Sequence, residues 1–146
     1  MEADAADLAA IKELVSAQFR SVAWTPGKQA DWATFTNGFL PGAMLFPAAR
    51  PVQPQMVQQF VDRMNRLRAD GTLASFEETP LGCVVSVFGN VAIAMSGCEM
   101  LENGKTVTRD VSGFLLVRDG GCWRIAAQAW DMESASRKIP PGLDAR

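Results

Sequence analysis

The sequence of 146 residues contains no histidine and no tyrosine. Without histidine, the chain cannot form a Ser-His-Asp triad, a Cys-His pair or a metal site with histidine ligands. Without tyrosine, it has no phenol to donate a hydrogen bond to an oxyanion. Any acid–base chemistry must therefore come from aspartate, glutamate, lysine or cysteine side chains. We predict neither a metal site nor a cofactor.

The sequence also lacks clustered basic residues and long apolar runs. Its net charge is −2 at pH 7, and its lysines and arginines are scattered, so we expect no nucleic-acid partner. No run approaches the roughly 20 apolar residues that span a bilayer, so we expect no membrane partner. The first residues are acidic and lack the regions of a secretory signal. We interpret Cys83, Cys98 and Cys122 as buried free thiols, which favours a cytoplasmic protein.

The first half of the chain has the apolar spacing of three helices. Apolar residues recur three and four positions apart after Asp4, after Asp31 and after Pro54, which is the pattern of a helix with one buried face. Pro41-Gly42 ends the second helix, and a short strand follows at 43–46. The apolar positions are Leu8, Ile11, Val15, Phe19 and Val22 in the first helix, Trp32, Phe35 and Phe39 in the second, and Met56, Val57, Phe60, Val61, Met64 and Leu67 in the third.

Over residues 79–132 the pattern changes to the alternation of β-strands. Turn signals, among them Asn103-Gly104 and Asp119–Gly121, separate antiparallel strands. Helices followed by a run of strands predict an α+β fold, in which the helices cover one face of a curved antiparallel sheet. A chain of this length forms one domain. We therefore predict a single domain over residues 1–146, with a loose tail at 135–146.

The turns predict which strand residues face one another. If Asn103-Gly104 is a two-residue turn, the numbers of paired residues add to 207. If Gly120-Gly121 is the next two-residue turn, the pairs add to 241, and Asp110 lies opposite Asp131. A turn at Asp119-Gly120 would slide the second pairing by two and keep the same faces, whereas a three-residue loop there would turn the side chains to the opposite face.

In this register one face of the sheet changes in character along its length. It is bulky and apolar near Trp123, small in the middle and acidic at the other end. Small side chains under a helical cover leave unfilled volume, so we predict a cavity with a carboxylate-lined end. The residues predicted to line it are Trp32, Phe35, Met95, Glu99, Ser112, Phe114, Trp123, Ile125, Ala127 and Ala129.

Asp110 and Asp131 are the candidate catalytic residues. Two ionised carboxylates at cross-strand distance repel, and burial raises the pKa of at least one further, which suits general acid–base chemistry. The alternative is that the register differs, or that both side chains point into water. Glu99 alone fits a solvated charge at a strand end, and Asp31 fits a helix cap.

The segment 117–125, Val-Arg-Asp-Gly-Gly-Cys-Trp-Arg-Ile, ends the run of strands with a tight turn and a Trp-Arg-Ile strand. Together with three N-terminal helices and a long antiparallel meander, it resembles the nuclear transport factor 2-like (NTF2-like) superfamily, in particular its SnoaL-like, ketosteroid-isomerase-like branch of small bacterial proteins. The resemblance covers residues 5–134. It implies a cone-shaped fold with three N-terminal helices packed on a curved, mixed, mainly antiparallel sheet. It also implies that Trp123 and Ile125 face the cone and that the protein forms a homodimer through the sheet.

The chain departs from the catalytic members of this superfamily. Several relatives carry histidines where Ala127 or Ala129 stands here, and the ketosteroid isomerases use a tyrosine that this chain lacks. The limonene-epoxide-hydrolase branch uses two aspartates with an arginine between them. Asp110 and Asp131 loosely resemble that pair, although Arg109 is one residue out of phase.

Three functional hypotheses remain. The first is a non-catalytic protein that binds a small apolar or ring-containing molecule in the cone. The second is a cofactor-independent lyase, isomerase, dehydratase or epoxide-hydrolase-type enzyme that uses carboxylate acid–base chemistry at Asp110 and Asp131. The third is a protein–protein adaptor that uses the exposed sheet face around Trp130.

Overall fold

A computed structural model describes residues 4–145. The helices are α1 (Ala5–Ser21), α2 (Trp32–Asn37), α3 (Val57–Ala69) and α4 (Pro141–Asp144), and the strands are β1 (Phe39–Phe46), β2 (Gln55–Met56), β3 (Phe76–Phe88), β4 (Val91–Glu102), β5 (Thr106–Asp119) and β6 (Cys122–Met132). The strands form one sheet in the order β2-β1-β6-β5-β4-β3. Neighbouring strands are antiparallel, except that β1 and β6 are parallel.

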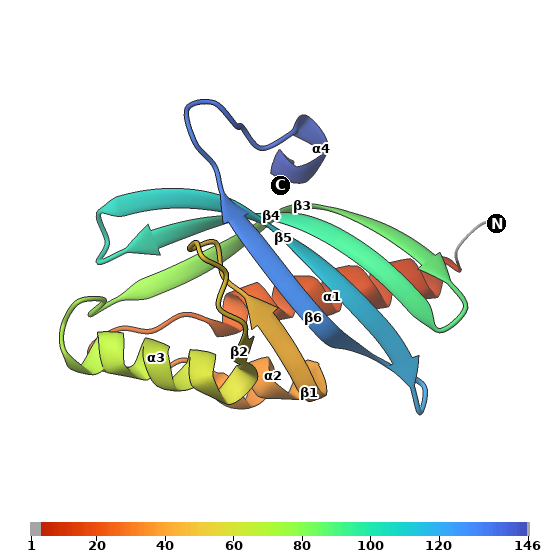
Figure 1. The fold of residues 1–146 in the computed structure, drawn as a ribbon, viewed down its shortest axis with the longest axis horizontal. Coiled ribbons are helices and arrows are strands. Elements are labelled where there is room, and N and C mark those ends of the chain that lie inside the picture. Colours follow the sequence, from red (N-terminus) through yellow and green to blue (C-terminus); the bar gives the residue numbers. More distant parts are fainter. Residues whose placement is uncertain (1–3, 146) are drawn as a thin grey trace.

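The helices α1, α2 and α3 lie on one side of the curved sheet, and α4 lies on the other side (Figure 1). This arrangement confirms the predicted α+β fold with a mixed, mainly antiparallel sheet. We call the sheet face beneath α1–α3 the inner face, which includes Ala94, Cys98, Phe114 and Ile125. The opposite, outer face includes Ile93, Met95, Leu115 and Ala127.

Most apolar positions expected on the helices are buried or half-buried, but Met56, expected in the third helix, lies in β2 and is 53% exposed. The Asp4 carboxylate accepts a hydrogen bond from the Ala6 N–H at the start of α1, and Ile11 and Val15 are fully buried. The Asp31 carboxylate accepts hydrogen bonds from Thr34 at the start of α2, so its interpretation as a helix cap is confirmed. Phe39, expected in the second helix, instead begins β1.

The Trp-Arg-Ile strand is fastened to the first helix through Asp7. The Asp7 carboxylate accepts hydrogen bonds from the Trp123 indole N–H at 3.1 Å and from the Arg118 guanidinium at 2.6 Å. Arg118 also lies over the Trp123 ring, 5.1 Å from its centroid. Ile125 beyond it is fully buried. Trp123 and Ile125 therefore face the helices, as the resemblance implies.

The loop between β4 and β5 differs from the predicted two-residue turn. Glu102 pairs with Thr106, so three residues intervene and the paired numbers add to 208. Asn103 and Gly104 adopt the positive φ values typical of an Asn-Gly turn, 54° and 68°. Lys105 is the additional residue. The predicted sum of 207 is wrong, and β4 presents its even-numbered side chains to the inner face.

The hairpin between β5 and β6 begins as predicted and is then shifted by a β-bulge. Asp119 pairs with Cys122 across Gly120-Gly121, which confirms the two-residue turn and the sum of 241 near it. Ala126 is the extra residue, because Leu116 pairs with Ile125 whereas Leu115 pairs with Ala127. Beyond the bulge every β6 side chain changes face relative to the prediction.

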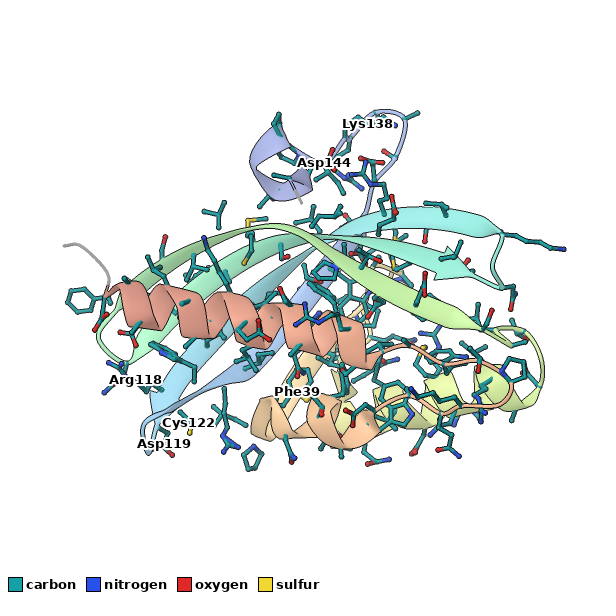
Figure 2. The ribbon with its side chains drawn as sticks, turned by 180° about the vertical axis from the view of Figure 1, so that it is seen from behind. Phe39, Arg118, Asp119, Cys122, Lys138 and Asp144 are labelled. Atoms are coloured by element: carbon teal, nitrogen blue, oxygen red, sulfur yellow. The ribbon has the colours of Figure 1, made fainter. Side chains whose placement is uncertain are left out.

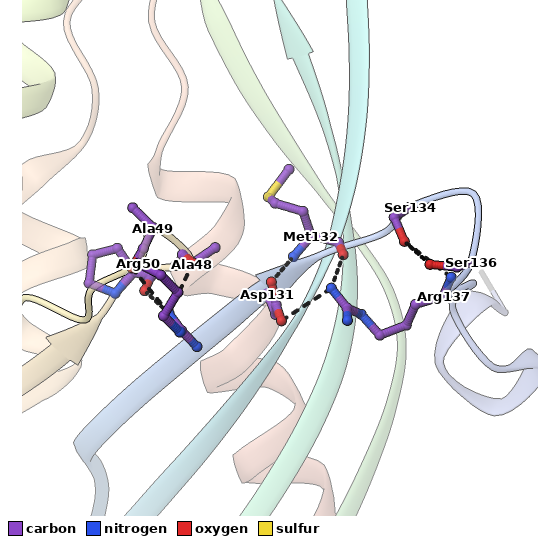
Figure 3. A network of polar contacts seen from close by, with 9 residues as sticks. Ala48, Ala49, Arg50, Asp131, Met132, Ser134, Ser136 and Arg137 are labelled. Carbon is purple, nitrogen blue, oxygen red and sulfur yellow. Dashed lines mark hydrogen bonds and ion pairs between the residues drawn. The ribbon is translucent and has the colours of Figure 1, made fainter.

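The predicted pairing of Asp110 with Asp131 is therefore wrong. Asp110 pairs with Met132 and points to the inner face, whereas Asp131 pairs with Val111 and points to the outer face. There Asp131 lies 3.2 Å from the Arg137 guanidinium (Figure 3). A single inserted residue suffices for this exchange, because side chains alternate between the two faces of a strand.

The expected loose tail is also contradicted, because residues 139–144 pack on the outer face. Ile139 and Leu143 are each 8% exposed and contact Leu81. Glycine at Gly97 permits this contact, since any Cβ there would collide with the Leu143 carbonyl. The side of the sheet that carries Lys138 and Asp144 is opposite to α1 (Figure 2).

The guanidinium of Arg109 holds this carboxyl-terminal segment in place. It forms ion pairs with Asp144, with Glu133 at 3.5 Å and with Glu99 at 3.8 Å. The Glu133 carboxylate also accepts a hydrogen bond from the Ile139 N–H. Arg109 and Glu99 therefore lie on the outer face, and Glu99 does not line the predicted cavity.

Candidate functional site

A cavity of about 320 Å³ lies between the inner face of the sheet and helices α1–α3. Its aromatic lining residues are Phe19, Phe35, Phe60, Phe76 and Trp130. Its methionine lining residues are Met64, Met100 and Met132. Its polar lining residues are Gln18, Arg63, Glu78, Glu102, Thr108, Asp110, Ser112 and Gln128.

The aromatic wall is a set of mutually packed rings from α2, α3 and β6. Phe35 and Phe60 stack with their centroids 5.4 Å apart, and Phe60 meets Trp130 edge to face at 5.9 Å. Trp32 packs edge to face against Phe35 at 5.4 Å from behind this wall, and its indole N–H donates to the Asn65 side chain. Contacts of this kind hold the rings in place, so the wall is a preformed apolar surface.

The acidic end of the cavity consists of Glu78 on β3 and Asp110 on β5, with β4 between them. On β4, Cys98 pairs with Asp110, and the next inner-face residue, Met100, pairs with Glu78. The two carboxyls thus lie on the same face, on either side of β4 and offset by one inner-face position, with their strands about 10 Å apart. Both line the cavity.

Burial dominates the electrostatics of these two carboxyls. Asp110 is only 5% exposed, and its Oδ1 has no hydrogen-bond partner. Burial raises the pKa of Asp110 to about 7. Burial and, to a smaller extent, the negative charge of Asp110 raise the pKa of Glu78 well above its ordinary value. Within residues 4–145, neither carboxyl forms an ion pair.

Cys98 lies between the two carboxyls and is fully buried. Burial, and then the charges of Glu78 and Asp110, raise the pKa of its thiol above the ordinary value. The thiol therefore stays protonated and is a poor nucleophile. All three cysteines are free, as predicted, but of the three only Cys98 is buried, whereas Cys83 is half-buried and Cys122 is exposed.

Two glutamine amides complete the polar lining. The Gln18 Nε2 donates to the Phe35 carbonyl at 2.8 Å, and Gln18 is 3% exposed. Gly38 lies directly against this amide, where any Cβ would collide with it. The Gln128 Nε2 donates to the Ser112 Oγ at 3.2 Å. One N–H of each amide is thus engaged within the protein, and the amide oxygens remain as acceptors.

The structure brings only some of the predicted site residues together. Phe35, Asp110 and Ser112 line the cavity. Phe114, Trp123 and Ile125 are on the inner face but belong to the packed core beyond the cavity. On the outer face are Met95, Glu99, Ala127, Ala129 and Asp131.

Met95 and Asp131 instead line a second hollow of about 310 Å³ between the outer face and the carboxyl-terminal segment. Trp130, proposed to lie on an exposed adaptor surface, is part of the inner aromatic wall. Arg50 does not reach the cavity, because its guanidinium donates to the carbonyls of its own loop, including Ala48 and Ala49 (Figure 3).

Several cavity residues were missed, and two of them left a signal in the sequence. Gln18 occupies an apolar-face position of α1, three residues after Val15, and a polar residue there indicates a buried hydrogen bond. Glu78 alternates with Phe76 at the start of β3, which places both on one face. Trp130 and Met132 reach the cavity only because of the bulge at Ala126, which no local pattern indicates.

In the part of the chain that is described, residues 4–145, no three histidine, cysteine or carboxylate side chains gather closely enough to hold a metal ion. Over the same residues, no helix is both long and apolar enough to cross a membrane.

Solved structures share this fold at low sequence identity. An NTF2-like protein of unknown function from Pseudomonas putida KT2440 aligns with a TM-score of 0.71 and 13% identity over 95% of this chain and 96% of that one. A second NTF2-like protein of unknown function, from Shewanella baltica OS155, aligns with a TM-score of 0.66 and 13% identity over 92% and 100%. The hexachlorocyclohexane dehydrochlorinase LinA-type3 from Novosphingobium barchaimii LL02 aligns with a TM-score of 0.69 and 16% identity over 93% and 95%.

No protein-family model and no curated protein matches this sequence. The predicted resemblance to the NTF2-like superfamily is thus confirmed at the level of the fold. Because one fold hosts many activities, function must be argued from the cavity itself.

Proposed function

From its NTF2-like fold and the aromatic cavity beneath the sheet, we propose that this protein binds a small ring-containing molecule. The observation that carries the proposal is the preformed wall of Phe35, Phe60 and Trp130 facing a few convergent polar groups. This combination is typical of small-molecule sites. A volume of about 320 Å³ is at the small end of such sites, so it suits a molecule of one or two rings.

Thermal-shift screening with one- and two-ring compounds tests this proposal, because a ligand that binds only the folded state raises Tm. Phe60→Ala removes part of the wall and should reduce the shift that each hit produces. Phe88→Ala is the matched control, since Phe88 is 70% exposed at a strand end away from the cavity. A screen in which no such compound raises Tm, or in which both variants respond equally, would contradict the proposal.

A second candidate is an acid–base lyase, isomerase or hydrolase, and the pair of carboxyls in one cavity favours it. With a pKa near 7, Asp110 can accept a proton from a bound substrate, while protonated Glu78 donates one to a carbonyl or a leaving group. The similarity of fold to a named dehydrochlorinase is compatible with this chemistry but does not establish it.

Mass spectrometry after incubation of each thermal-shift hit with the protein tests for turnover. Asp110→Asn should abolish product formation while the protein stays folded. Asp131→Asn should leave turnover unchanged, because Asp131 lies on the outer face. Product formation that survives Asp110→Asn would eliminate the acid–base hypothesis.

We also propose that the outer face forms a homodimer. The apolar side chains Val84, Ile93, Met95 and Leu115 are between 42% and 59% exposed on neighbouring strands, and such a patch marks an interaction surface. Ile93→Lys should convert a dimer into a monomer in light scattering, whereas Glu77→Lys, at the far end of β3 on the same face, should have less effect. A monomeric wild type would refute the dimer, and an unrelated protein captured in stoichiometric amounts would favour the adaptor hypothesis.

A further inference from the structure

The cavity is lined by more acidic side chains than basic ones. Glu78, Glu102 and Asp110 line it, and Arg63 is the cationic residue among the described lining residues. Arg63 is exposed, so its charge is largely screened by water. Asp110, in contrast, is 95% buried and its Oδ1 receives no hydrogen bond. A buried carboxylate without a partner is unstable unless it acquires a positive charge or a proton.

We propose that the ligand of this cavity is a ring-containing amine whose protonated nitrogen is held by Glu78 and Asp110. The inference rests on the proposed binding function and specifies its ligand class. An ammonium group supplies the positive charge that the two carboxyls lack. It also supplies several N–H donors and no acceptor.

Several oxygen atoms around the cavity can accept hydrogen bonds from a ligand, which also favours an ammonium group. The amide nitrogen of Gln18 already donates to the Phe35 carbonyl, and that of Gln128 donates to Ser112. Their amide oxygens and the carboxyls are the acceptors that remain. A carboxylate would place further negatively charged acceptors against these oxygens, whereas an ammonium complements them.

The apolar wall suits the rest of such a molecule. The rings of Phe35, Phe60 and Trp130 offer flat apolar surface to an aromatic or alicyclic body. Ring faces also attract cations, by about 0.5–2 kcal/mol according to how dry the site is. The wall and the acidic end therefore recognise the two parts of one amphiphilic molecule.

The proposal implies a coupling between binding and protonation. An ammonium binds the ionised carboxylates, and Asp110 is mostly protonated below its pKa of about 7. Amine binding should therefore release a proton below pH 7 and become tighter as the pH rises from 6 to 8. A neutral ring compound should show the opposite trend or none, because it does not gain from ionised carboxylates.

Isothermal titration calorimetry with three compounds of one ring system tests the proposal: 2-(2-naphthyl)ethylamine, 2-(2-naphthyl)ethanol and 2-naphthylacetate. At pH 8 the amine should bind about tenfold more tightly than the alcohol, the effect of one charge-assisted hydrogen bond. The acetate should bind least. Asp110→Asn and Glu78→Gln should each remove the preference for the amine, and Glu77→Gln is the matched control because Glu77 is exposed on the other face of β3.

The outcomes separate this inference from the binding function. If the alcohol or the acetate binds as tightly as the amine, the proposal of an amine ligand is refuted, while the proposal of a ring-binding cavity is not affected. The amine is likewise refuted if its affinity does not rise with pH, or if Glu77→Gln weakens its binding as much as Glu78→Gln does. If neither this series nor any other ring compound raises Tm, both proposals fail together.

Discussion

Replacing Asp110 with asparagine should stabilise the protein at alkaline pH and leave its stability at acidic pH unchanged. Asparagine keeps the size of the protonated acid but cannot ionise. In the unfolded chain Asp110 loses its proton near its ordinary pKa of 3.8, whereas burial delays this loss in the folded state to about pH 7. Between these values the folded state binds more protons, so the free energy of unfolding falls as the pH rises. Above pH 7 the free energy of unfolding falls no further through this carboxyl.

The size of the effect follows from the difference between the two pKa values. The shift from 3.8 to about 7 is roughly three units, and each unit corresponds to about 1.36 kcal/mol. The wild type should therefore lose about 4 kcal/mol of stability between pH 4 and pH 8 through this carboxyl. The variant should not. For a chain of 146 residues this difference amounts to a Tm higher by on the order of 10 °C at pH 8.

Urea denaturation of both proteins at pH 4, 6 and 8 measures this prediction. Asp131→Asn is the control, because Asp131 is exposed on the outer face, away from the cavity. Equal stability differences between wild type and Asp110→Asn at all three pH values would refute the reasoning. A destabilised Asp110→Asn at pH 8 would show that the ionised carboxylate makes favourable contacts instead.

Three further experiments, two with substitutions and one with a thiol reagent, test other parts of the structure. Gly97→Val should displace Leu143 from the outer face, lower stability by about 1–3 kcal/mol and expose the carboxyl-terminal segment to trypsin. Gly113→Val on the same face has open space around it and should do neither; equal effects of the two would contradict the docking of the segment. Gln18→Leu should cost about 1–3 kcal/mol in urea denaturation, because the Phe35 carbonyl loses its buried donor; an unchanged variant would show that water replaces the amide. Finally, Cys122 should react with a thiol reagent in the folded protein, whereas Cys98 should react only after unfolding; early labelling of Cys98 in a peptide map would refute its burial.

Local sequence patterns were sufficient to predict the three N-terminal helices and the fold. The spacing of Ile11, Val15 and Phe19 marks the buried side of α1, and all three are buried. The tight turn at Gly120-Gly121 and the strand after it oriented Trp123 inward. These features depend on neighbours close in the sequence, and such neighbours determine helical faces and two-residue turns.

Local sequence patterns could not predict which residues line the cavity. One extra loop residue at Lys105 and one bulge at Ala126 each shift a strand by a single position. Because strand side chains alternate, each shift exchanges the two faces of the sheet. As a result, Asp131, predicted to lie in the site, is outside it, and Trp130 lines the cavity instead.

The sequence by itself determined that this chain has no histidine or tyrosine chemistry, that it forms an α+β fold with three N-terminal helices, and that Trp123 and Ile125 face those helices. Only the tertiary structure decided that Asp110 shares its cavity with Glu78 rather than with Asp131. The physical reason is that sheet register is a long-range property: it depends on how whole strands are buried against the helices, so a one-residue insertion is accepted wherever it improves that burial.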